Sequence, residues 1–166
     1  MTTLIKNGTV VTSTGASSAE VLIDGETIVA VLQPGSELAG AAERGAETVI
    51  DASSKLVVPG GVDVHTHMEL PFGGTVASDD FESGTRAAAW GGTTTIVDFA
   101  TQSHGLDVRE CFDDRMALAQ GNCAIDYGFH MIIGDVNDAS LKEMDLLVNE
   151  GVTSFKLFMA YPGVFY

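Results

Sequence analysis

The chain has 166 residues, 45% of them hydrophobic, which excludes a disordered tail and suffices for one domain of ordinary size or one with a small appendage. Its 8 Lys and Arg against 23 Asp and Glu residues give a formal net charge of −15, which argues against nucleic acid and anionic membranes as partners because polyanions would be repelled. No apolar run reaches the roughly 18 residues that span a bilayer and no secretory signal opens the chain, so we expect a soluble, cytoplasmic protein.

The first part of the chain, residues 1–58, predicts a small, mostly β unit. Runs rich in β-branched residues alternate with turns, and Asp24-Gly25 lies between two of them, which is a hairpin signal. Residues 34–48 break this pattern and are expected to form a loop or a short helical turn.

From Pro59 onward, residues 59–166 alternate between strand and helix patterns, which predicts parallel strands joined by crossovers. The predicted strands lie near residues 62–67, 93–100, 124–133 and 152–159. The predicted helices run from Ser78 to Trp90, from 107 to 120, and from near Asp138 to Gly151. This order suits a doubly wound sheet or a (β/α)₈ barrel. The barrel reading makes the chain a part of a longer protein, because eight strands need about 250 residues.

Two histidines, His65 and His67, end the first of these strands. Side chains alternate along a strand, so both imidazoles point to the same side with Cα atoms about 6.5 Å apart, close enough to converge on one ion. Catalytic zinc sites commonly have at least three protein ligands, so a further ligand, preferably an anion, must join them. Asp63 and Asp98 are candidates for groups that support the ligands, whereas His104 and His130 are expected to be surface or hydrogen-bonded histidines.

Lys156 stands in the middle of VTSFKLFMAY, where a parallel strand should be buried on both faces. One reading is a lysine that reaches solvent or pairs with a carboxylate. The other is a buried amine with a depressed pKa that acts as a base, forms a Schiff base or reacts with CO₂. A carbamylated lysine would supply the missing anion and could bridge two metal ions. Cys111 and Cys123 have no metal-binding spacing and read as reduced thiols.

Four segments closely resemble the dihydropyrimidinases and bacterial D-hydantoinases, which are cyclic-amide hydrolases of the amidohydrolase superfamily. They are PGGVDVHTHMELPFGGT, AAWGGTTTIVDFA, CAIDYGFHM and GVTSFKLFMAYPGVFY. The resemblance implies an α/β fold, namely the first four or so βα units of a (β/α)₈ barrel, preceded by a small β-sandwich segment. It also implies two divalent metal ions, usually zinc, a cyclic ureide or imide as substrate, and a homo-oligomer, either tetramer or dimer.

The resemblance assigns roles to individual residues. The HxH histidines bind one metal, here His65 and His67. The lysine of FKLFMAY, here Lys156, is carboxylated and bridges both metals, and the tyrosine five residues later, Tyr161, donates a hydrogen bond to the developing oxyanion. The loops after HxH and after the lysine strand shape the substrate pocket. Candidates for lining it are Met68, Leu70, Phe72, Phe158 and Phe165.

The remaining ligands of this family, two histidines and a proton-shuttling aspartate, come from later barrel strands. His104 and His130 do not match their motifs, so we expect the 166 residues alone to be inactive. The completed protein is expected to open hydantoin or dihydropyrimidine rings to N-carbamoyl amino acids. The alternatives are an allantoinase-like or dihydroorotase-like enzyme, or a non-catalytic dihydropyrimidinase-like protein.

Overall fold

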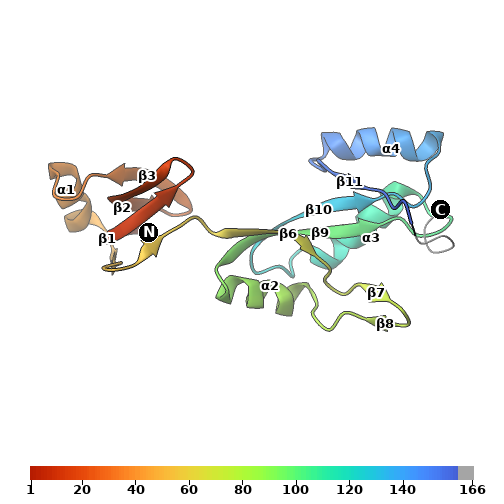
Figure 1. Ribbon diagram of the computed structural model, residues 1–166, viewed down its shortest axis with the longest axis horizontal. Helices are drawn as coiled ribbons and strands as arrows, with labels where there is room; N and C mark the ends of the chain where they lie inside the picture. The colour runs from red at the N-terminus through yellow and green to blue at the C-terminus, as the bar shows by residue number, and fades with distance from the viewer. Residues whose placement is uncertain (161–166) are drawn as a thin grey trace. The chain divides into compact units, whose positions relative to one another are not determined.

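The structure, a computed structural model, describes residues 1–160. The chain divides into two compact units, one from Met1 to Pro59 and one from Gly60 onward (Figure 1). Within the described residues, no helix is long and apolar enough to cross a membrane.

The N-terminal unit is a five-stranded sheet in the order β3-β2-β1-β4, with β5 also paired to β1. Its strands are β1 (Thr2–Thr12), β2 (Gly15–Asp24), β3 (Thr27–Leu32), β4 (Thr48–Asp51) and β5 (Leu56–Val57). The predicted hairpin at Asp24-Gly25 is confirmed, since β2 and β3 pair in antiparallel fashion. Gly25 has a φ of 59°, a left-handed value that glycine adopts without strain.

Residues 34–48 contain more helix than the loop or short turn that we predicted. Helix α1 (Glu37–Gly45) has nine residues. Its first turn is capped by Ser36, whose side chain accepts a hydrogen bond from the Ala39 N–H at 3.2 Å, which satisfies one of the free donors at the helix start. The sequence pattern underestimates this helix because glycines interrupt an alanine-rich segment that otherwise favours helix.

The second unit is built on a four-stranded sheet in the order β11-β10-β9-β6, in which every neighbouring pair is parallel. Its strands are β6 (Gly61–Thr66), β9 (Thr93–Thr101), β10 (Asp126–Ile132) and β11 (Phe155–Lys156). The crossovers contain α2 (Phe81–Trp90), α3 (Val108–Ala119) and α4 (Asp138–Asn149). Strands adjacent in this chain order are also adjacent in the sheet, as in half of a barrel, whereas a doubly wound sheet reverses direction.

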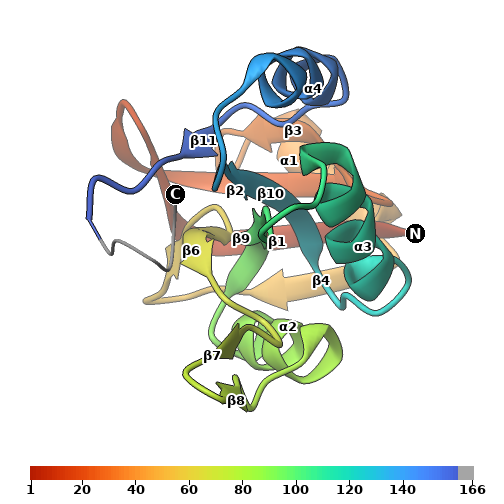
Figure 2. The same cartoon turned by 90° about the vertical axis from the view of Figure 1, so that its right-hand side faces the viewer.

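The sheet is curved, and Figure 2 shows α2, α3 and α4 along its outer side. The main core lies between the sheet and these helices. Its most deeply buried members are Phe81, Ile96, Ala100, Val108, Ala119, Met131 and Leu147. Strand residues of even number on β9 and odd number on β10 therefore face the helices, and the alternate residues face the inner side.

Two element boundaries differ from the prediction. Helix α2 is capped by Asp80 rather than Ser78, because the Asp80 carboxylate accepts the Ser83 N–H at 2.6 Å while the Ser83 hydroxyl accepts the Asp80 N–H at 3.1 Å. This reciprocal pair is a capping box. Strand β11 is only Phe155–Lys156, shorter than the predicted 152–159.

After β6, the short hairpin of β7 (Pro71–Phe72) and β8 (Thr75–Val76) turns at two glycines.

Candidate active site at the carboxyl end of the sheet

The two histidines and the lysine meet on the inner side of the sheet, near the carboxyl ends of its strands. His65 is the penultimate residue of β6, His67 follows that strand directly, and Lys156 ends β11. Between β6 and β11 lie β9 and β10. In parallel α/β folds, the carboxyl ends of the strands are where reactive groups from separate segments converge.

The Phe99 ring, on β9, is the common neighbour of these groups. Its centroid lies 4.7 Å from that of His65 and 4.9 Å from that of His67. The Lys156 Nζ lies 4.6 Å from the same centroid. The two imidazoles are 5.0 Å apart, nearly perpendicular to each other. One aromatic side chain thus gathers the three predicted ligands from the two edge strands of the sheet.

His67 has the properties of a neutral imidazole that lacks a partner. Its Nδ1 atom is buried and has no hydrogen-bond partner within residues 1–160. Burial is the main reason why the pKa of His67 is lowered. Asp98 opposes this shift, while the neighbouring His65 and the charges of Lys156 and Arg115 lower the pKa further. Neutral imidazole is the form that binds metal ions.

Lys156 is half-buried, which corrects the expectation of a lysine buried on both faces in the middle of a strand. The strand ends at this residue, so its side chain emerges at the sheet edge. Its Nζ lies between two aromatic rings, 4.6 Å from the Phe99 centroid and 4.9 Å from that of Phe158. No carboxylate within residues 1–160 forms an ion pair with it, so the carboxylate-paired reading is not supported there.

His130, on β10, is hydrogen-bonded, as predicted. Its Nε2 lies 2.8 Å from the Val64 carbonyl oxygen, and its Nδ1 contacts the Ser154 hydroxyl. Because a carbonyl only accepts, Nε2 is the donor in its hydrogen bond to Val64. The ring also lies 4.8 Å from that of Phe99. His130 therefore ties the backbone beside His65 to the segment just before Lys156. His104 is exposed in the loop after β9.

The two aspartates predicted to support the ligands differ in burial. Asp63 is exposed, and its carboxylate accepts the His65 N–H at 3.1 Å. Asp98 is fully buried on the helix side of β9 and pairs with Arg115 of α3. Our sequence reasoning missed Arg115. The signal was present, because Arg115 continues the apolar stripe of Val108, Cys111 and Phe112, where a cation is expected only if it has a buried partner.

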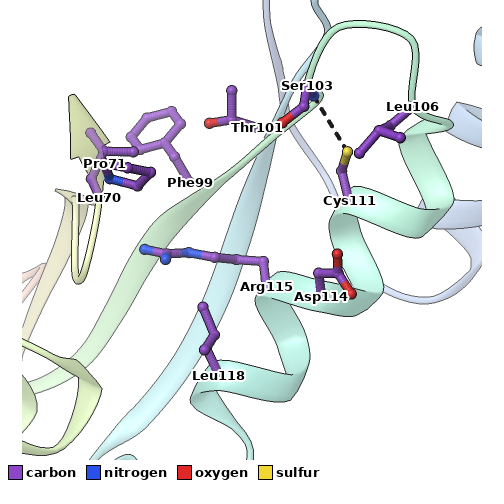
Figure 3. A pocket seen from close by; sticks show the side chains of 10 residues that line it. All are labelled: Leu70, Pro71, Phe99, Thr101, Ser103, Leu106, Cys111, Asp114, Arg115 and Leu118. Atoms are coloured by element: carbon purple, nitrogen blue, oxygen red, sulfur yellow. Dashed lines mark hydrogen bonds between the residues drawn. The ribbon is translucent and has the colours of Figure 1, made fainter. Parts of the chain in front are cut away.

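Two hollows adjoin this group. One of about 500 Å³ is lined by His65, Phe99, His130 and Lys156, among others. The other, of about 280 Å³, lies between Leu70-Pro71 and α3, and Figure 3 shows Arg115 reaching from α3 toward these two residues. Both volumes are in or near the range of small-ligand sites.

The structure divides the predicted pocket residues into different environments. Leu70 lines the smaller hollow, and Phe158 lies beside Lys156. Phe72 is 71% exposed on β7. Met68 differs from the prediction, because its side chain packs against the helix-side core near Gly84. The predicted Tyr161 and Phe165 lie outside the described residues.

Comparison with known proteins identifies the family. A family model described as Amidohydrolase family matches residues 56–165. The chain belongs to this family. It is 64% identical to a D-hydantoinase of Streptomyces coelicolor, over 99% of this chain and 35% of that protein. It is 49% identical to a D-hydantoinase of Geobacillus stearothermophilus, over 99% of this chain and 34% of that protein.

Solved structures agree with the sequence comparison. The crystal structure of a dihydropyrimidinase from Brevibacillus agri matches with a TM-score of 0.89 and 47% identity, covering 99% of this chain and 34% of that one. This amidohydrolase chain therefore corresponds to the N-terminal part of the D-hydantoinases and dihydropyrimidinases. It spans about a third of the length of the curated relatives it matches.

The residues of this amidohydrolase chain fit part of a metal centre. Within residues 1–160, no three His, Cys, Asp or Glu side chains are grouped so that they could hold a metal ion. The two converging imidazoles, one of them with an unpartnered buried nitrogen, nevertheless present the neutral donors that a divalent ion prefers.

Proposed function

We propose that the full-length protein containing this chain is a metal-dependent hydrolase that opens the cyclic amide of hydantoins and dihydropyrimidines to give N-carbamoyl amino acids. The observation that carries the proposal is the convergence of His65, His67 and Lys156 around Phe99 at the carboxyl end of the sheet. The high identity to D-hydantoinases supports the same reaction class.

In this proposal, His65 and His67 hold one of two divalent ions, which we expect to be zinc. The Lys156 amine, after addition to CO₂ and loss of a proton, would be a carbamate and would supply the anionic ligand for these ions. The Lys156 Nζ lies over the rings of Phe99 and Phe158 and has no carboxylate partner in the described chain, so no ion pair competes with this reaction. The ligands of the second ion would come from later parts of the full-length protein.

When bound, divalent ions in such a centre would polarise the amide carbonyl and lower the pKa of a bound water to about 7. The chain's own residues then orient the substrate. Tyr161, by the family resemblance, donates a hydrogen bond to the oxygen of the amide under attack. The water oxygen bonds to the carbonyl carbon, the ring C–N bond breaks, and the departing nitrogen takes up a proton from an acid supplied by the rest of the protein.

The N-terminal unit is proposed to be part of a β-sandwich. Its single sheet leaves several large apolar side chains exposed, which a second layer would cover. These include Ile28, Val31, Val49 and Leu56. That the full-length protein is a cytoplasmic homo-oligomer, a tetramer or a dimer, is part of the same proposal and follows from the family resemblance.

Allantoinase-like and dihydroorotase-like activities are the alternative within the same chemistry. The segments MELPF and MAYPGVF, which follow the two histidines and the lysine in the sequence, are largely apolar and suit a neutral ring better than the more polar substrates of those enzymes. A non-catalytic relative is the other alternative, and it would not need the grouping of His65, His67 and Lys156.

The test uses the full-length protein. Its metal content is measured by elemental analysis, and ring opening is followed with hydantoin, dihydrouracil, allantoin and dihydroorotate. We expect two divalent ions per chain and turnover of the first two substrates, with metal lost in the His65→Ala and His67→Ala variants. A metal-free protein that turns over none of the four would overturn the proposal, and exclusive turnover of allantoin or dihydroorotate would replace the substrate class.

A further inference from the structure

We propose that Asp98 and Arg115 are a positioning pair that holds the backbone on both sides of His67 from the helix side of the sheet. The inference rests on the proposed function in that His67 is taken as a metal ligand. The contacts of the pair, however, can be tested without any metal.

The regular pairing of β6 with β9 fails where His67 must be placed. Asp63 pairs with Ile96, but the next pair is Thr66 with Asp98, so the register shifts between them. β6 ends at Thr66. The backbone at His67 and Met68 therefore lies beyond the strand, and ladder hydrogen bonds of β6 do not determine its position.

In place of strand pairing, a single carboxylate oxygen of Asp98 holds the backbone at His67 and Met68. Asp98 is fully buried, and its Oδ2 accepts the Thr66 hydroxyl at 2.9 Å and the Met68 N–H at 2.8 Å. Both chain neighbours of His67 are thus attached to one atom of the neighbouring strand. A carboxylate that accepts such bonds is held by stronger interactions than a neutral acceptor would provide.

Arg115 completes the arrangement from α3. Its Nε donates to Asp98 Oδ1 at 3.1 Å, and its Nη2 contacts both the same oxygen and the Met68 carbonyl oxygen. The guanidinium lies 4.7 Å from the centroid of the Phe81 ring. The Met68 N–H is therefore held by Asp98 and the Met68 carbonyl by Arg115. Both peptide groups of this residue are fixed, which leaves its backbone little freedom.

The choice of a charged pair at this place has a physical reason. A buried ion pair is weak evidence for stability, because desolvation offsets the attraction, but it can select one conformation among several. Within residues 1–160, the side-chain hydrogen bonds of Asp98 and Arg115 join the two residues to each other or to Thr66 and Met68, apart from the Phe99 N–H that Asp98 Oδ1 accepts. Removing one hydrogen bond to this segment should loosen His67 while leaving the sheet intact.

The experiment compares matched threonine variants of the full-length protein. Thr66→Val removes the hydroxyl that Asp98 accepts but keeps the side-chain shape, and Thr66→Ser keeps the hydroxyl. Thr85→Val is the control, because Thr85 is a buried threonine of α2 whose hydroxyl accepts the Ala124 N–H far from His67 along the chain. Arg115→Lys keeps the charge but loses the forked donor geometry.

Two readouts are taken. The first is the Zn²⁺ dissociation constant from competition with a chelator, which should rise about tenfold or more in Thr66→Val and Arg115→Lys, as for other groups that orient metal ligands, and stay near wild type in Thr66→Ser and Thr85→Val. The second is hydrogen exchange in the metal-free protein, where the peptide containing Met68 should exchange faster in the first two variants only.

The two readouts separate the inference from the proposed function. If wild-type protein binds no metal, the proposed function fails, and the exchange of the Met68 amide still decides the inference. If Thr66→Val and Arg115→Lys change neither exchange nor metal affinity more than Thr85→Val does, the positioning role is overturned. Wild-type metal affinity and exchange rate in Thr66→Ser would support the positioning role. This variant keeps the hydroxyl but changes the side-chain shape, so a purely steric effect would not spare it.

Discussion

Two phenylalanines on adjacent strands show how differently the two faces of the parallel sheet are used. Phe129 on β10 faces the helices and contacts the rings of Phe81, Phe112 and Tyr127. Phe99 on β9 faces the inner side. Its neighbours are His65, His67, His130 and Lys156. Each ring is thus the common neighbour of several side chains. Those around Phe129 are aromatic core residues, whereas those around Phe99 are imidazoles and an amine.

The faces also differ in how their polar groups are satisfied. On the helix side, Asp98 and Thr85 are fully buried and hydrogen-bonded. On the inner side, His67 Nδ1 and Thr101 Oγ1 are buried and have no partner within residues 1–160. Unpaired buried polar atoms cost free energy, and both of these atoms lie on the face that holds the candidate site.

The largest expected effect is the loss of activity in a Lys156→Ala variant of the full-length protein. The variant removes the proposed bridging ligand, so the fall in kcat/KM should exceed the about 10²–10³-fold loss caused by removing one oxyanion donor. Short carboxylic acids should restore part of the rate. Lys142→Ala, an exposed lysine of α4, is the matched control. Full metal content and activity without Lys156 would contradict its role.

Replacing Phe129 and Phe99 by alanine, one at a time, should separate effects on stability from effects on metal binding. Phe129→Ala should lower the unfolding free energy by about 3–5 kcal/mol because a buried aromatic side chain leaves a cavity, while the folded protein keeps its metal. Phe99→Ala should release metal, since the imidazoles lose the ring they share. Denaturant unfolding and elemental analysis measure both. Equal metal loss in the two variants would show that the faces are not functionally distinct.

Replacing Thr85 and Thr101 by valine tests whether buried hydroxyls on the two faces differ in their hydrogen bonding. Thr85→Val should cost about 1–3 kcal/mol in unfolding free energy, because the Ala124 N–H loses its acceptor. Thr101→Val should leave stability unchanged or raise it, since its hydroxyl has no partner in the described chain. Thermal unfolding of the full-length variants gives both values. A destabilised Thr101→Val would mean that this hydroxyl is bonded in the complete protein.

The smallest effect concerns Cys123, which packs beside the helix-side core. Burial, and secondarily the charge of Asp98, raise the pKa of its thiol above the ordinary value of 9.0. A raised pKa means less thiolate at pH 8, so alkylation should be slower than in the unfolded chain. Peptide mass spectrometry after timed iodoacetamide treatment measures the rate. Equal rates before and after unfolding would place Cys123 in an exposed environment.

The sequence predicted the parts of the site that depend on local geometry. The spacing of His65 and His67 on a strand placed them on one face, and the alternation of strands and helices placed the site at the carboxyl end of a parallel sheet. The free state of Cys111 and Cys123 was also predicted correctly. For Met68 the local sequence was a poor guide to side-chain direction, because its neighbours belong to the candidate site while its own side chain packs against the helix-side core.

What the sequence determined by itself was the order of elements, the residue types of the candidate ligands and the family, because these follow from periodicity, turn residues and motifs along the chain. Only the tertiary structure showed that His65, His67 and Lys156 all lie beside Phe99. It also showed that Asp98 and Arg115 contact the backbone of Met68. Both arrangements join residues about 30 or more positions apart. Such contacts are set by strand register and helix packing, which side-chain patterns along one segment do not encode.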